Sequence, residues 1–140
     1  MWAGIAHTAY TVPDMDAALD FYVGKLGLSH AFTLRNDDGV PTIEYLMLAP
    51  GQFIELFYAR AGFENPKGSY AHLCLRTEAL EDAVTRLSAA GVAIRRGVQR
   101  GRDGNLQAWI DDPAGNAIEL MQIADDSPQA RVSRGESAGI

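Results

Sequence analysis

Two histidines and two glutamates stand at matching positions in the two halves of this sequence. The interval from His7 to His72 is one position longer than the interval from Glu55 to Glu119. Both glutamates lie among apolar residues, in FIELF and AIELM, where an ionised carboxylate is costly to bury unless a cation or strong donors meet it. Two carboxylates and two imidazoles suit one divalent ion, whose charge the carboxylates neutralise. The pattern therefore predicts a mononuclear metal site made of these four side chains.

The donor atoms of this predicted site narrow the choice of metal. Nitrogen and oxygen ligands without thiolate suit Ni²⁺, Co²⁺, Zn²⁺, Mn²⁺ or Fe²⁺, and the sequence does not choose among them. Four protein ligands in an octahedral shell leave two positions for water or substrate. Open positions of this kind distinguish a catalytic metal from a closed structural one.

A single residue of this kind would have an ordinary explanation. A lone strand histidine is usually a satisfied core or surface residue, and a lone strand glutamate is usually solvated or paired with an arginine such as Arg60. The matched positions favour the metal site over these explanations. His30 has no counterpart in the second half and is interpreted as structural or peripheral. Cys74 shares a strand face with His72 by alternation and is interpreted as small apolar filler.

The elements that must position the four side chains repeat with the same spacing as the glutamates. Residues 14–28 and 78–92 both resemble amphipathic helices, and each ends at a glycine, Gly27 or Gly91, where a left-handed helix cap is expected. A strand with the histidine precedes each helix, and three strands follow it, the last of which carries the glutamate. The sequence therefore predicts an α+β fold of two tandem βαβββ modules.

Length and composition set the remaining expectations. The chain has 140 residues, 47% of them hydrophobic, which suits one domain that needs no disulfides. A net charge of −6 argues against a nucleic-acid footprint, and no apolar run approaches the roughly 20 residues that span a membrane. The single cysteine and the lack of a signal-like N-terminal segment favour the cytoplasm. Residues 125–140 are small, polar and charged, and are predicted to form a mobile tail.

Four stretches of the chain resemble the vicinal oxygen chelate superfamily and, within it, bacterial glyoxalase I. They are HTAYTVPDMDAALDFYVGKLGL, FIELF, YAHLCL and DDPAGNAIELMQ, and DPAGN followed by IEL is a specific marker of this superfamily. The resemblance implies one glyoxalase-like domain over residues 1–124, with modules of about 1–62 and 63–124. Their curved mixed sheets would surround the metal-binding cavity. A homodimer is also implied, with the metal site either within one chain or between two subunits.

The activity implied by this resemblance is that of a metal-dependent lyase or isomerase. Its small-molecule substrate would be an enolisable carbonyl compound, such as the hemithioacetal of a 2-oxoaldehyde and a thiol, and would react through a metal-bound enediolate. The quartet of His7, Glu55, His72 and Glu119 matches the ligands of glyoxalase I, and Glu119 and Glu55 are the candidates for the base. Five further residues are candidates for contact with a thiol-linked or anionic substrate: Arg100, Arg60, Tyr45, Trp109 and Met121.

Two positions depart from the pattern of bacterial glyoxalase I. Thr11 and Ala59 stand where the family has an arginine and an asparagine that contact glutathione. The sequence therefore does not identify the thiol that the substrate carries. Three other functions of the superfamily are therefore alternatives: an acyl-thioester epimerase or isomerase, an extradiol dioxygenase, and a non-catalytic small-molecule binding or resistance protein. The dioxygenase ranks lower because Glu55 would occupy a position that oxygen needs. A resistance binder would usually lack the metal quartet.

Overall fold

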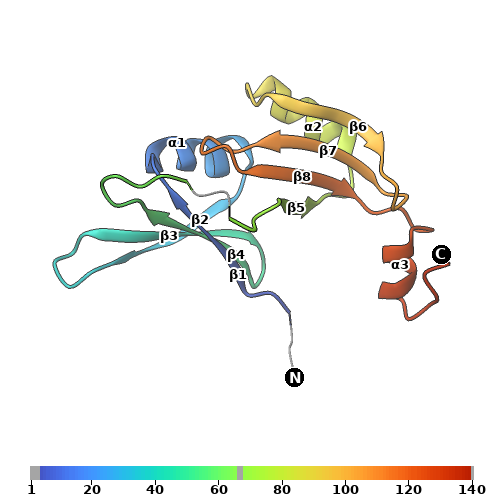
Figure 1. Cartoon of the computed structure of the whole chain (residues 1–140), viewed down its shortest axis with the longest axis horizontal. Coiled ribbons are helices and arrows are strands. Elements are labelled where there is room, and N and C mark those ends of the chain that lie inside the picture. Colours follow the sequence, from blue (N-terminus) through green and yellow to red (C-terminus); the bar gives the residue numbers. More distant parts are fainter. Residues whose placement is uncertain (1–3, 66–67, 140) are drawn as a thin grey trace. The chain divides into compact units, whose positions relative to one another are not determined.

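The chain forms two compact units, residues 1–68 and 69–140, and the computed structural model describes residues 4–65 and 68–139. Each unit contains one four-stranded mixed sheet built in the order strand, helix and three strands (Figure 1). The predicted α+β class and the tandem βαβββ modules are therefore confirmed.

Unit 1 has the strand order β1-β4-β3-β2. Strand β1 is parallel to β4, and the other neighbouring strands are antiparallel. The first helix begins as an α-helix and continues as a π-helix, η1. The elements are β1 (His7–Val12), α1 (Met15–Leu19), η1 (Asp20–Lys25), β2 (Ser29–Arg35), β3 (Pro41–Ala49) and β4 (Gln52–Tyr58).

Unit 2 repeats this topology with the strand order β5-β8-β7-β6, in which β5 and β8 are parallel. A short third helix follows the last strand. The elements are β5 (Leu73–Arg76), α2 (Leu80–Ala89), β6 (Ile94–Arg100), β7 (Leu106–Asp111), β8 (Ala117–Gln122) and α3 (Pro128–Ser133).

The start of the first helix and the ends of both long helices follow signals in the sequence, whereas the start of α2 at Ala79 has no side-chain cap. Asp14 caps the first helix by accepting a hydrogen bond of 2.9 Å from the amide of Ala17. Gly27 and Gly91 have φ angles of 88° and 81°, as expected for left-handed residues after a helix. No helix within the described residues is long and apolar enough to cross a membrane.

The apolar core repeats with the same period as the two glutamates. Three side chains on the face of each sheet that points away from the glutamate are at most 5% exposed. They are Leu46, Ile54 and Leu56 in unit 1, and Ile110, Ile118 and Leu120 in unit 2. In each unit the glutamate stands between the last two of these residues in sequence. Because side chains alternate along a strand, burial of these residues on one face of the sheet places the glutamate on the other face.

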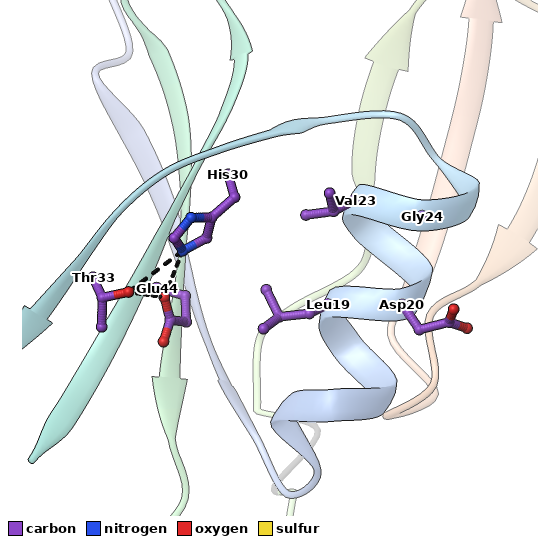
Figure 2. A pocket seen from close by; sticks show the side chains of 7 residues that line it. All are labelled: Leu19, Asp20, Val23, Gly24, His30, Thr33 and Glu44. Carbon is purple, nitrogen blue, oxygen red and sulfur yellow. Dashed lines mark hydrogen bonds and ion pairs between the residues drawn. The ribbon is translucent and has the colours of Figure 1, made fainter.

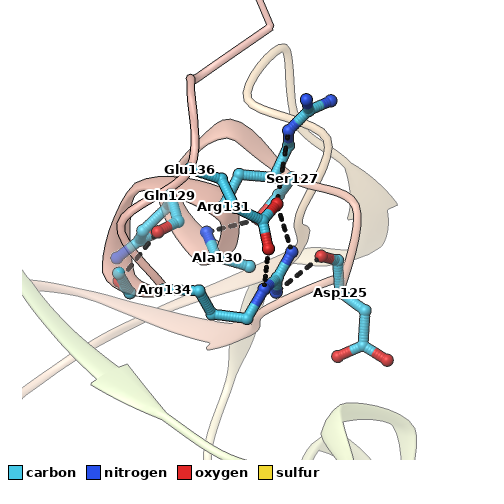
Figure 3. Close-up of polar contacts among 8 residues, drawn as sticks. Asp125, Ser127, Gln129, Ala130, Arg131, Arg134 and Glu136 are labelled. Carbon is cyan, nitrogen blue, oxygen red and sulfur yellow. Dashed lines mark hydrogen bonds and ion pairs between the residues drawn. The ribbon is translucent and has the colours of Figure 1, made fainter.

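The segment predicted to be a mobile tail has local structure. Ser127 is buried and accepts a hydrogen bond from the amide of Ala130 at the start of α3, and Arg134 binds Glu136 and the carbonyl of Asp125 (Figure 3). The side-chain carbonyl oxygen of buried Asn105 accepts from the amide of Ala124 and so fixes the beginning of this segment. The mobility of the segment stays a prediction.

Gly91→Ala should destabilise the protein, because a Cβ in the left-handed region costs about 1–2 kcal/mol. A Cβ at Gly91 would meet no atom within 4 Å, so the effect isolates backbone strain. Gly97→Ala is the matched control, since it has equal free space but no left-handed φ. Urea denaturation should show a lower free energy of unfolding only for Gly91→Ala. Equal stability of the two variants would contradict this account of the helix end.

Candidate functional site

Each unit holds one close pair of a histidine and a buried glutamate. In unit 1, His7 Nδ1 lies 3.2 Å from Glu55 Oε1, and in unit 2, His72 Nε2 lies 3.1 Å from Glu119 Oε2. Both glutamates are 4% exposed, whereas the histidine side chains are 48% and 37% exposed. Each pair therefore presents an accessible imidazole beside a carboxylate removed from water.

The two pairs occupy equivalent places in the strand register. Ala9 is paired with Glu55 in unit 1, and Cys74 is paired with Glu119 in unit 2. Each histidine stands two positions before that partner, so it lies on the same face of the sheet as the glutamate. His7 belongs to β1, whereas His72 immediately precedes β5. Unit 2 therefore has one residue fewer than unit 1 between its histidine strand and its helix. This accounts for the unequal histidine and glutamate spacings, and the pairing of the histidine strand with the glutamate strand is the same in both units.

The turn before β8 fixes the start of the strand that carries Glu119. Asp112 is 5% exposed, and its carboxylate accepts hydrogen bonds from the amides of Ala114 and Asn116 at 2.9 and 2.8 Å. Gly115 has a φ of 80°, and Gly51, at the equivalent position before β4, has a φ of 76°. The DPAGN sequence therefore serves as a rigid turn that positions the glutamate strand.

The geometry of each pair fits coordination to one metal ion. Two ligand atoms that lie about 2.1 Å from one ion and at a right angle to each other are about 3.0 Å apart. The separations of 3.2 and 3.1 Å are close to this value. Each pair contains one nitrogen and one oxygen donor. Among residues 4–65 and 68–139, no group of three or more His, Cys, Asp or Glu side chains is arranged to hold a metal.

An aromatic residue lies across the sheet from each glutamate. Tyr45 is paired with Glu55 in unit 1, and Trp109 is paired with Glu119 in unit 2. Hydrogen bonding to Glu55 raises the pKa of Tyr45. The Trp109 ring packs edge-on against His72, with ring centroids 4.9 Å apart. Both predicted substrate-contact aromatics therefore lie beside the metal-ligand candidates.

Aromatic packing around Tyr45 was not predicted from the sequence. Phe32 stacks on Tyr45 with ring centroids 4.3 Å apart, and Phe53 meets it edge-on at 6.3 Å. Phe32 is 45% exposed, so this face of the first sheet keeps an accessible apolar surface beside Glu55. The alternation in FIELF, which places Phe53 on the Glu55 face, was the available signal.

The remaining predicted substrate contacts are placed differently. Met121 lies on the same face as Glu119 and is 8% exposed, and Arg60 is exposed just beyond β4. Arg100 is paired with Leu106, on the face opposite Glu119, and its guanidinium donates to the carbonyl of Gly104.

Arg96 is a basic residue that lies on the Glu119 face. It is paired with Trp109, which in turn is paired with Glu119. A bulge between Arg96 and Gln99 reverses the alternation, so Arg96 and Arg100 point to opposite faces despite their even spacing. Spacing alone could not reveal this, and the available signal was Gly97 within the bulge, since an isolated glycine in a strand pattern suggests a bulge.

The Cys74 thiol lies beside the second pair. Partial burial and the negative charge of Glu119, together with a hydrogen bond to it, raise the pKa of Cys74 to about 12. The thiol therefore stays protonated at neutral pH in the metal-free protein.

Comparison with known proteins relates the chain to one superfamily. A family model described as the Glyoxalase/Bleomycin resistance protein/Dioxygenase superfamily matches residues 4–120. A protein named probable lactoylglutathione lyase from Vibrio cholerae is 29% identical over 124 residues, which cover 84% of this chain and 89% of the relative. A lactoylglutathione lyase from Salmonella typhimurium is 25% identical over 126 residues, which cover 86% and 93% of the two chains.

Solved structures show the same fold. A lactoylglutathione lyase from Agrobacterium tumefaciens is similar with a TM-score of 0.66 and 26% identity, over 86% of this chain and 93% of that chain. A glyoxalase family protein from Enterococcus faecalis has a TM-score of 0.72 at 23% identity, over 86% and 98% of the two chains. The second likeness concerns the fold alone.

Cys74 in the metal-free protein should react slowly with iodoacetamide at pH 7.5, at least about tenfold more slowly than free cysteine, because the thiolate is the reactive form. The rate should rise with pH through the whole range up to pH 10. Glu119→Gln removes the adjacent negative charge and should increase the rate several-fold at pH 7.5. Mass spectrometry of the alkylated protein measures both rates. A rate equal to that of free cysteine would contradict the raised pKa.

Proposed function

Because the chain belongs to the Glyoxalase/Bleomycin resistance protein/Dioxygenase superfamily, we propose that it is a metal-dependent lyase or isomerase of the glyoxalase I type. The observation that supports this most is the pair of equivalent His–Glu contacts, His7 with Glu55 and His72 with Glu119. A purely structural role would not require the same exposed imidazole beside the same buried carboxylate in both repeats. One divalent ion bound by all four side chains accounts for both pairs.

The proposed substrate is an enolisable carbonyl compound, such as a 2-oxoaldehyde–thiol hemithioacetal. Relatives named lactoylglutathione lyase support this class of substrate. Thr11 and Ala59 lie on the Glu55 face of unit 1 by strand alternation and offer no charge to a glutathione carboxylate. Arg96, on the Glu119 face, is the proposed contact for an anionic part of the substrate.

The bound ion would supply Lewis-acid stabilisation of negative charge that develops on the substrate oxygens. The side chains of the chain itself divide the remaining tasks. Tyr45 hydrogen-bonds Glu55 and so restrains this carboxylate. Glu119 lies opposite Trp109 instead of a phenol, and its hydrogen bond comes from the thiol of Cys74, which is a weaker donor than a phenol hydroxyl. We therefore assign to Glu119 the transfer of the proton between the two substrate carbons, and to Glu55 a fixed ligand role.

The metal-free protein should bind one divalent ion per chain when titrated separately with Ni²⁺, Co²⁺, Zn²⁺, Mn²⁺ or Fe²⁺. His7→Gln and His72→Gln should each weaken this binding by at least about tenfold, because each removes one of four ligands. Calorimetry measures the affinity without reference to activity. His30→Gln is the matched control and should retain full affinity. Absence of metal binding, or equal affinity in all three variants, would refute the proposed site.

A complementation experiment determines which chains supply the four ligands. One variant lacks the unit 1 pair, and the other lacks the unit 2 pair: His7→Gln with Glu55→Gln, and His72→Gln with Glu119→Gln. If the site lies between two subunits, a dimer of the two variants has one complete metal site, made of the two intact pairs, and one site without ligands. Recovery of metal binding on mixing therefore places the site between subunits, and no recovery places it within one chain.

Glu119→Gln should reduce turnover of the methylglyoxal–glutathione hemithioacetal by at least about 100-fold, since proton transfer by a positioned base contributes roughly 10²–10⁴-fold. Tyr45→Phe, which releases Glu55 without removing a ligand, should reduce turnover less. Metal content is measured on the same samples. A Glu119→Gln protein that keeps its metal and its full rate would contradict the assigned role. Metal binding without turnover by the unaltered protein would favour another enolisable substrate, such as an acyl thioester.

A further inference from the structure

Four polar side chains gather on the face of the first sheet that points away from Glu55. They form the His30 cluster, which consists of His30, Thr33, Glu44 and Tyr58. Tyr45 is paired with Glu55, so the preceding residue, Glu44, projects from the other face. A bulge between His30 and Phe32 turns His30 to this face as well.

The polar groups of the His30 cluster are engaged with one another. Glu44 is 5% exposed, and its Oε2 accepts hydrogen bonds from Thr33 Oγ1 at 2.6 Å and from His30 Nε2 at 2.7 Å. Its Oε1 accepts from the Tyr58 hydroxyl at 2.6 Å. Burial opposes ionisation of Glu44, but the three hydrogen bonds outweigh it and lower the pKa of Glu44. An ionised carboxylate only accepts, so the donors of the other three side chains are directed to it.

An open pocket of about 460 Å³ is lined by this cluster and by the first helix. The helix contributes Leu19, Val23 and Gly24, and Figure 2 shows the side chains of Leu19 and Val23 pointing toward the cluster. The carboxylate of Asp20 points away from the cluster and is paired with Lys25 at 3.0 Å. The helix side of the pocket is therefore apolar.

The sheet side of the pocket also presents little that a charged ligand can bind. Figure 2 shows both nitrogens of the His30 ring on the side away from Leu19 and Val23, so a carbon edge of the ring faces the helix. The Thr33 hydroxyl donates within the cluster, and the Glu44 oxygens are met there by three donors. The described residues that line the pocket include no lysine or arginine. A ligand in the pocket therefore meets mainly carbon.

Unit 2 fills the equivalent space with protein. At the offset between the two metal-ligand glutamates, Leu87 corresponds to Val23, and Ala108 corresponds to Glu44. Leu87 is 1% exposed and Ala108 is 0% exposed, and α2 contacts β6, β7 and β8. The module therefore folds with its helix packed on this face of the sheet. The pocket of unit 1 is a difference between the two repeats and not a requirement of the fold.

The helix that lines the pocket is itself irregular. Its second part, η1, is a π-helix, in which the amide of Leu26 donates to the carbonyl of Phe21, five residues earlier, at 2.7 Å. The lining residues Asp20, Val23 and Gly24 all belong to this segment. The corresponding helix of unit 2, α2, is a regular α-helix. Because π-helical turns are rare and occur frequently at functional sites, this irregular turn supports a role for the pocket that it lines.

We propose that this pocket is a second ligand site, and that it binds a small uncharged apolar molecule, of which a monocyclic aromatic compound is the simplest example. The ligand packs between the side chains of Leu19 and Val23 and the carbon edge of the His30 ring, and the removal of apolar surface from water drives binding. A carboxylate or ammonium group would lose its water without gaining an unengaged partner. The volume is within the range of small-molecule sites. The site lies on the opposite sheet face from Glu55, so it does not depend on the proposed metal chemistry.

The test uses toluene as the probe, with benzoate and benzylammonium as anionic and cationic comparators of similar shape. The NMR resonances of the Leu19 and Val23 methyl groups report binding to the full chain. Toluene should shift these resonances with a Kd in the millimolar range or below, and should bind at least about tenfold more tightly than either comparator. Val23→Leu, which installs the residue of unit 2, should weaken binding, and Val23→Phe should abolish it by filling the pocket. The Leu19 methyl groups report binding in both variants.

Phe32→Ala is the matched control, because Phe32 is an exposed aromatic residue on the opposite sheet face, and it should leave the toluene-induced shifts unchanged. Circular dichroism confirms that each variant is folded, and Val23→Leu tests the pocket even if Val23→Phe fails to fold. The proposal is overturned if toluene at its solubility limit leaves the methyl resonances unchanged, if either comparator binds as tightly as toluene, or if the Val23 variants bind toluene normally. Metal binding is measured separately, so this site and the metal site can fail independently.

Discussion

The structure depends on how it satisfies carboxylates that are buried in the middle of β-sheets. Glu55 and Glu119 each occupy a strand whose neighbouring side chains are apolar, and each is 4% exposed. Removing a carboxylate from water is costly, and each glutamate is met within its own unit by an imidazole at 3.1–3.2 Å and by one further donor, Tyr45 for Glu55 and Cys74 for Glu119. A cation shared by both pairs, as proposed, would add a positive charge to this compensation. The same requirement would make the site sensitive to loss of any one ligand.

The duplicated module turns this local constraint into a matched pair of sites. The apolar residues on either side of each glutamate in sequence point into the core, and this fixes the direction of the glutamate itself. The parallel strand beside it then places the histidine on the same face, two positions before the register partner of the glutamate. Tyr45 and Trp109 at equivalent positions give the two glutamates different neighbours. The repeat thus preserves the pair and varies its surroundings.

The first sheet shows that a β-sheet can carry two separate chemistries on its two faces. Glu44 and Tyr45 are adjacent in sequence, yet one lies in the His30 cluster and the other contacts Glu55. The two carboxylates are satisfied by different means, Glu44 by three hydrogen-bond donors and Glu55 by His7 and Tyr45.

The sequence by itself determined the repeat, the order of the elements, the helix-ending glycines and the matched His–Glu positions. These features follow from local rules: apolar alternation, the left-handed preference of glycine and the spacing of equivalent residues. Only the tertiary structure decided that Arg96, and not Arg100, shares the face of Glu119, and that His30 joins Glu44. Both outcomes result from bulges in β2 and β6, where one extra residue reverses which face a side chain takes. A bulge is set by pairing with another strand, so residue spacing along one strand cannot reveal it.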